Sequence, residues 1–134
     1  MKIHHLGIVI SDLDQALSAL GLDRTAIRES VFDPVQKNTL HFIHLPDNNL
    51  WLELVEPKSE DASTATFARK FTIGLHHLAM SASNLDAAEN HYTSQSGAFT
   101  LGRYHIAIKS FGGAISTLFI AVHGLILEFV KNDP

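Results

Sequence analysis

The 134-residue sequence predicts an α+β fold made of two tandem βαβββ modules. The first observation is a repeat, because residues 4–17 (HHLGIVISDLDQAL) and residues 76–89 (HHLAMSASNLDAAE) are identical at seven of fourteen positions. Background composition would give roughly one identity. The second observation is an apolar phrase with an embedded acid near the end of each half: LWLELVEP around Glu53 and LILEFVKN around Glu128. The two halves therefore indicate an internal duplication.

The first module is expected at about residues 1–57. It begins with an apolar strand at 2–10, and Ser11 is placed to cap a helix over 12–20 whose apolar residues recur at helical spacing. Gly21 ends this helix. Between turn-forming segments, further strands are expected near 25–32, 39–45 and 50–56.

A polar connector is expected at about 58–72, with a short helical pattern at 64–70. The second module, at about 73–134, repeats the order with a strand at 74–82 and a helix at 85–95. Ser83 or Asn84 caps that helix and Gly97 ends it; strands follow near 98–101, 103–109, 115–122 and 125–131. A sheet covered by helices on one face fits an α+β fold.

Composition narrows the function classes. Hydrophobic residues make up 46% and charged residues 18% of the chain, as in a folded protein, so we expect a single domain over residues 1–134. The formal net charge is −4 and the sequence has no basic run, so it lacks the basic patch that is typical of nucleic-acid-binding proteins. The apolar stretch 114–130 is interrupted by Ser116, His123 and Glu128, which argues against a membrane span. No signal-peptide pattern opens the sequence, so a cytoplasmic protein is expected.

Strand alternation separates two histidines from the core. His5 shares a side of the first strand with Gly7 and Val9, while the other side is apolar and is expected to pack beneath the helices. The same pattern turns His77 away from the helices in the second half. Glu53 and Glu128 lie in the middle of strongly apolar strands, where an unpaired carboxylate is costly to bury. These acids therefore need a partner.

The four residues together predict one metal site, with His5, Glu53, His77 and Glu128 as ligands. Imidazole and carboxylate suit Fe, Mn, Co, Ni or Zn, and the absence of cysteine excludes thiolate ligands. Taken singly, a strand histidine is usually structural and a strand acid can pair with Lys or Arg. The repetition of the whole set in matching frames favours the metal.

The other histidines carry weaker patterns. His4 and His76 are expected to point to the face opposite the ligands, as packing or edge residues. The remaining five have no repeat partner and are assigned to surface or satisfied core positions: His41, His44, His91, His105 and His123.

At these residues the chain resembles the vicinal oxygen chelate superfamily, which includes glyoxalase I, methylmalonyl-CoA epimerase, extradiol dioxygenases and bleomycin-resistance proteins. The phrases HHLGIVISDLD, WLELVEP, GLHHLAM and LILEFV carry the resemblance over nearly the whole chain. GLHH, ELVEP and the loop at 33–37 are most similar to methylmalonyl-CoA epimerase-like proteins.

The resemblance implies modules whose sheets curl around a cleft with a divalent metal ion (Co, Ni, Mn, Zn or Fe) inside. His5, Glu53, His77 and Glu128 would hold this ion. It implies a metal-dependent isomerase, epimerase or lyase of a small carbonyl or thioester substrate, acting through a metal-stabilised enediolate. A carboxylate moves the proton, with Glu128 the first choice and Glu53 the second. A homodimer is also implied.

The sequence departs from a true epimerase at Val35, where that enzyme usually carries a Glu before the loop glutamine. Two alternatives therefore stay open. One is an extradiol dioxygenase-like Fe(II) enzyme in which His5, His77 and Glu128 form a facial triad. The other is a non-enzymatic small-molecule binding or resistance protein, which needs no metal.

Overall fold

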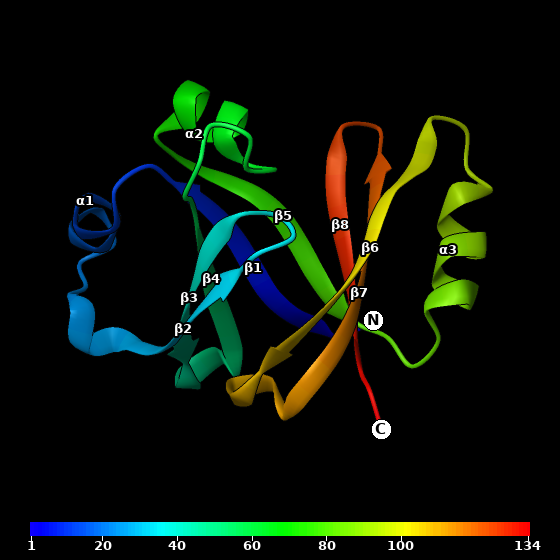
Figure 1. The fold of residues 1–134 in the computed structure, drawn as a ribbon. Helices are drawn as coiled ribbons and strands as arrows, with labels where there is room; N and C mark the ends of the chain where they lie inside the picture. The colour runs from blue at the N-terminus through cyan, green and yellow to red at the C-terminus, as the bar shows by residue number, and fades with distance from the viewer. The chain divides into compact units, whose positions relative to one another are not determined.

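The structure, a computed structural model, describes all of residues 1–134, with eight strands and three α-helices (Figure 1). The first module holds β1 (Ile3–Ile10), α1 (Leu13–Ala19), β2 (Ile27–Asp33), β3 (Asn38–Leu45) and β4 (Leu50–Pro57). The connector holds α2 (Ala65–Phe71). The second module holds β5 (Ile73–Ser81), α3 (Leu85–Thr93), β6 (Ala98–Ile108), β7 (Gly113–Val122) and β8 (Leu125–Asn132). The α+β class and the βαβββ order of both halves are confirmed.

The chain divides into two compact units whose boundaries cut through β1 and β5. One unit is Leu6–His76, in which the strands follow the order β2-β3-β4-β1. The other combines Met1–His5 with His77–Pro134 and has the order β5-β8-β7-β6. In this second unit β5 and β8 are parallel, whereas β7 is antiparallel to both of its neighbours. The start of β1 therefore belongs with the second module.

Each unit has a core between its sheet and one helix. In the unit Leu6–His76, Ile10 and Leu54 pack with Leu13 and Leu17 of α1, and Leu6 and Ile8 lie against this cluster. In the other unit, α3 lies along β6, β7 and β8 (Figure 1). Its core contains Met80, Leu85, Leu118, Ile120 and Phe129. The apolar side of each module's first strand faces its helix, as the alternation predicted.

Two local expectations were wrong. Asp12 caps α1 in place of Ser11, because its carboxylate accepts the backbone N–H of Gln15 at 2.7 Å while the Ser11 N–H donates to the carbonyl of Thr72. Asn84 caps α3 in the same way, as expected.

The second correction concerns β6, which is one strand instead of two strands broken at Gly102. Its pairing with β7 skips one residue between Thr100 and Gly102, so a bulge absorbs the irregularity without ending the strand.

All helices of the structure are too short or too polar to span a membrane.

Candidate metal centre

Three of the four predicted ligands lie in one unit, on three different strands. His5 is on β1, His77 on β5 and Glu128 on β8. The parallel pairing of β5 and β8 puts Ala79 beside Glu128. The backbone N–H of Ser81 donates to the carbonyl of Lys2, which ties the start of β1 to the end of β5. Sheet pairing therefore brings together residues that are far apart in the sequence.

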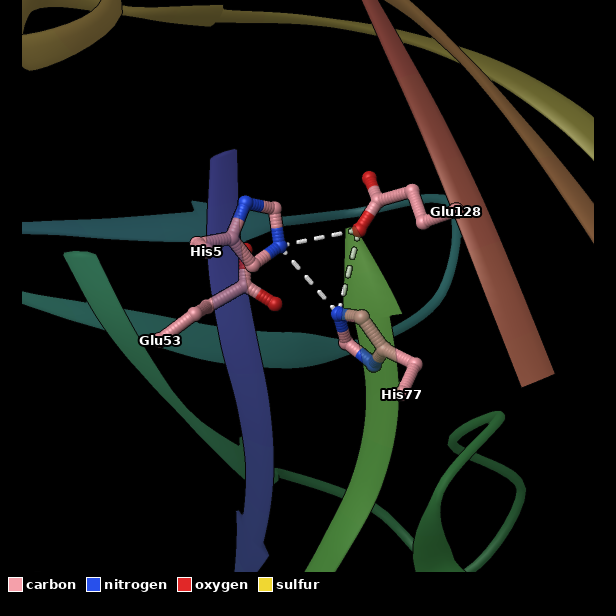
Figure 2. Close-up of side chains that lie close together, drawn as sticks. All are labelled: His5, Glu53, His77 and Glu128. Atoms are coloured by element: carbon pink, nitrogen blue, oxygen red, sulfur yellow. Dashed lines mark hydrogen bonds and ion pairs between the residues drawn. The ribbon is translucent and has the colours of Figure 1, made fainter. Parts of the chain in front are cut away.

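The side chains of His5, His77 and Glu128 point toward one another in Figure 2. Nε2 of His5 lies 2.9 Å from Oε1 of Glu128, and Nε2 of His77 lies 3.0 Å from the same oxygen. The two Nε2 atoms are 3.2 Å apart. All three residues are buried, with exposed fractions of 1% for His5 and 4% for each of the others. Three donor atoms thus form a compact triangle away from bulk water.

The surroundings of Glu128 keep its carboxylate ionised. Burial by itself raises the pKa of this group, because the charged form loses its hydration. The interactions with His5 and His77 outweigh burial and hold the pKa of Glu128 below its usual range. The group therefore carries a negative charge at neutral pH in an otherwise apolar place.

The contacts inside the triangle suit a shared cation better than direct hydrogen bonding. Oε1 of Glu128 has no aligned hydrogen-bond donor, although two imidazole nitrogens lie within 3.0 Å of it. Metal–ligand bonds of about 2.1 Å separate two ligands at right angles by about 3.0 Å, and two tetrahedral ligands by about 3.4 Å. The spacings of 2.9, 3.0 and 3.2 Å match the first value more closely. The donor set and its geometry therefore fit a divalent transition metal.

The fourth predicted ligand, Glu53, is placed by β4 in the other unit. It lies in the middle of that strand, opposite Phe42 of β3. Its side chain is buried, with 7% exposed. It occupies the position in the first module that Glu128 occupies in the second. Its assignment as a ligand stays a prediction.

Aromatic rings line the triangle, and they were not predicted as site residues. His77 packs edge to face on Phe119 with ring centroids 5.5 Å apart, and Phe119 meets Tyr104 at 5.8 Å. His5 stacks on Phe111 at 6.0 Å with an angle of 13°. Phe119 pairs with Glu128 across β7 and β8, so counting the hairpin register back from Glu128 would have found it.

His4 was expected to point away from the ligands, but it contacts one of them. Its Nδ1 is 2.9 Å from Nδ1 of His5, and its ring meets Phe111 edge to face at 4.4 Å. Phe111 packs against both rings, so His4 shares its surroundings with a predicted ligand. His76 packs edge to face against Phe67, with centroids 4.9 Å apart, as a packing residue should.

A serine, a histidine and a glutamate form a chain in the unit Leu6–His76. Ser30 Oγ is 2.7 Å from Nδ1 of His41, and Nε2 of His41 is 3.2 Å from Oε1 of Glu56. Lys58 pairs with the same glutamate oxygen at 3.1 Å. Both ring nitrogens of the buried His41 are therefore satisfied, which confirms its assignment as a satisfied core residue.

The chain is similar to a known protein family. The family model of the Glyoxalase/Bleomycin resistance protein/Dioxygenase superfamily matches residues 4–111. The matched stretch includes His5, Glu53 and His77 and ends before Glu128. No curated protein matches the sequence.

Solved structures share the fold over nearly the whole chain. One is methylmalonyl-CoA epimerase from Mycobacterium tuberculosis, at 24% identity and a TM-score of 0.78, covering 99% of this chain and 89% of that one. A hypothetical protein from Bacillus halodurans has 21% identity and a TM-score of 0.75, covering 99% and 95%. A variant of Streptomyces coelicolor methylmalonyl-CoA epimerase in complex with 2-nitronate-propionyl-CoA has 22% identity and a TM-score of 0.76, covering 100% and 99%. At these identities the likeness shows the fold alone.

Proposed function

Because this chain belongs to the Glyoxalase/Bleomycin resistance protein/Dioxygenase superfamily, we propose that it is a metal-dependent epimerase-like enzyme. The reaction moves a proton next to the carbonyl of a small substrate. The observation that carries the proposal is the buried triangle of His5, His77 and Glu128, in which one carboxylate oxygen lacks an aligned donor. Glu53 is proposed as the fourth ligand, because it is the buried counterpart of Glu128 in the first module.

The ligand chemistry divides the work among these residues. A bound divalent cation supplies a Lewis acid that stabilises negative charge developing on a carbonyl oxygen. The two imidazoles anchor the site, and the carboxylates compensate the cation's charge. Because all four side chains are buried, water competes weakly for these positions.

Glu128 is the first candidate to move the proton, and Glu53 is the second. While Glu128 contacts His5 and His77 its pKa is held low, which makes it a weak base. If it moves away from the two imidazoles, burial remains as the dominant influence and raises its pKa. Glu128 thus becomes a competent base only after it leaves the triangle. Val35 carries no ionisable group and is an exposed residue of the turn after β2, so it has no part in this step.

The proposed substrate class is an acyl-CoA thioester with an acidic hydrogen next to the carbonyl. Methylmalonyl-CoA epimerases with this fold support that choice, one of them in complex with 2-nitronate-propionyl-CoA. The thioester carbonyl acidifies the neighbouring carbon, which suits the proton transfer that the carboxylates would perform.

The test combines metal analysis with proton exchange. Untagged protein purified without a chelating column should contain about one transition metal per chain. In deuterated water it should catalyse exchange at the carbon next to the carbonyl of methylmalonyl-CoA or a hemithioacetal, and a chelator should stop the exchange. A metal-free protein that cannot be loaded would contradict the proposal, as would a loaded protein without exchange on either substrate.

A dioxygenase is the second candidate, favoured by one specific observation. Two histidines and one carboxylate at mutual distances of 2.9 to 3.2 Å are the donor set of a facial triad, which binds Fe(II) with open positions. In that case Glu53 is not a ligand. Oxygen uptake by the Fe(II)-loaded protein with a catechol would favour this function over proton transfer.

A further inference from the structure

We propose that His4 is a positioning residue that holds His5 in the tautomer able to bind a metal. The inference rests on the proposed metal site. Its starting point is the contact between the two rings, in which Nδ1 of His4 lies 2.9 Å from Nδ1 of His5. Nε2 of His5 belongs to the triangle with His77 and Glu128. The His5 ring thus uses one nitrogen for the triangle and the other for His4.

The hydrogen bond between the two rings has two directions with opposite consequences. A neutral imidazole carries one N–H and one free lone pair. If Nδ1 of His5 donates to Nδ1 of His4, then Nε2 of His5 offers its lone pair to a cation. If Nδ1 of His4 donates instead, the proton of His5 sits on Nε2 and blocks that position. The direction of this single bond decides whether His5 can act as a ligand.

Phe111 fixes the geometry that the bond needs. This phenylalanine is buried and packs against both rings, stacking on His5 and meeting His4 edge to face. Its ring restricts the rotation of both imidazoles, so the two Nδ1 atoms stay within hydrogen-bond distance. For His5 to bind the metal through Nε2, His4 must accept the hydrogen bond from Nδ1–H of His5 and carry its own proton on Nε2. Histidine ligands in proteins are commonly oriented by such a partner on the second ring nitrogen.

The inference predicts an effect on metal affinity that depends on the acceptor and not on ring volume. His4→Phe keeps an aromatic ring against Phe111 but has no acceptor for the N–H of His5. His4→Asn provides a carbonyl oxygen close to the place of Nδ1 and should restore the bond. Loss of such an outer partner typically weakens metal affinity by about 10 to 100-fold.

The experiment titrates metal-free, untagged protein with Zn²⁺ against a chromophoric chelator. We expect the dissociation constant to rise by about 10 to 100-fold in His4→Phe, and His4→Asn to stay close to the wild type. His91→Phe, on the exposed surface of α3, is the matched control and should leave the constant unchanged. Circular dichroism of each metal-free variant verifies that it is folded.

A second readout reports the tautomer directly in the wild-type protein, so it does not depend on any variant folding. In Zn²⁺-loaded protein with ¹⁵N-labelled histidine, long-range ¹H–¹⁵N correlation should show Nδ1 of His5 protonated and Nδ1 of His4 unprotonated. A protonated Nδ1 on His4 would overturn the inference. Wild-type Zn²⁺ affinity in His4→Phe, or a loss in His4→Asn equal to that in His4→Phe, would also overturn it. If the wild-type protein itself fails to bind Zn²⁺, the proposed function fails first, so the two failures are distinguishable.

Discussion

His77 and Glu128 meet from two parallel strands, with Nε2 of His77 3.0 Å from Oε1 of Glu128. β5 opens the second module and β8 closes it, so this contact joins the two ends of the module. Phe119 stands opposite Glu128 on β7 and also packs against the ring of His77. The two groups are thus held by the sheet register and by a shared aromatic neighbour.

The first prediction is that His77→Ala abolishes metal retention while the protein stays folded. The substitution removes one of the two imidazoles from the triangle. The remaining ligands are then too few to retain a cation. The fold should survive with a loss of about 0.5–3 kcal/mol, because the core against α3 lies on the other side of the sheet. Elemental analysis and thermal unfolding measure both effects. His91→Ala, on α3, is the control, and a normal metal content in His77→Ala would refute the assignment.

The second prediction concerns acid stability without metal. The pKa of Glu128 is lowered in the folded protein, so the unfolded chain binds a proton at this group more readily than the native state. Its contribution to stability is present above the unfolded pKa of about 4.3 and is lost as the pH falls toward the lower folded value. The Tm of the wild type should therefore fall more steeply between about pH 5 and pH 3 than that of Glu128→Gln. Parallel curves would show that Glu128 is not held ionised by His5 and His77.

Much of this architecture could be predicted because it depends on local pattern. The repeat placed His5 and His77 at equivalent points of two strands, and alternation separated them from the core residues Leu6 and Met80. The structure confirms the strands that carry His5 and His77, and all four predicted ligands are buried in it.

What the sequence left open depends on pairing between distant segments. The residues around Phe111 do not indicate that its ring packs on His5. Phe111 lies in a 3₁₀ turn that is far from His5 in the sequence, and only the folded chain brings the two rings together. The cap of α1 was misplaced for a local reason, since Asp12, and not Ser11, carries the side chain that accepts from the backbone N–H of Gln15. The continuity of β6 through Gly102, by contrast, needs the partner strand β7.

The third prediction is that the absence of a side chain at Gly102 leaves the space that the ring of Tyr104 occupies. A Cβ at residue 102 would lie 2.8 Å from the hydroxyl of Tyr104 and 3.1 Å from two of its ring carbons. The contact is with the outer end of a half-buried ring that can move aside, so Gly102→Ala should cost only about 1 kcal/mol through overpacking. The gain of about 0.4–1 kcal/mol from a less flexible unfolded chain nearly offsets this cost. In a Tyr104→Ala background the clash disappears, and the same substitution should be neutral or stabilising. Denaturant unfolding of the four proteins measures the coupling, and additive effects would contradict it.

The last prediction separates the two proposed functions through Glu53. If Glu53 is the fourth ligand of an epimerase-like site, Glu53→Gln removes a charged donor. The Zn²⁺ dissociation constant should then rise more than tenfold, because losing a direct ligand weakens affinity at least as much as losing an outer-shell partner of a ligand. Proton exchange should fall with it. In a facial triad of His5, His77 and Glu128, the same variant would keep its metal affinity.

Glu56→Gln is the matched control, because Glu56 lies on the same strand, β4, and pairs with His41 and Lys58. It should leave metal affinity unchanged, whatever it does to stability. Unchanged affinity in Glu53→Gln, together with catechol-dependent oxygen uptake by the Fe(II)-loaded wild type, would replace the proton-transfer function with the dioxygenase. Weakened affinity in Glu53→Gln but not in Glu56→Gln would favour the proton-transfer function. A fourth protein donor would then occupy one of the three positions that a facial triad leaves open for oxygen and catechol.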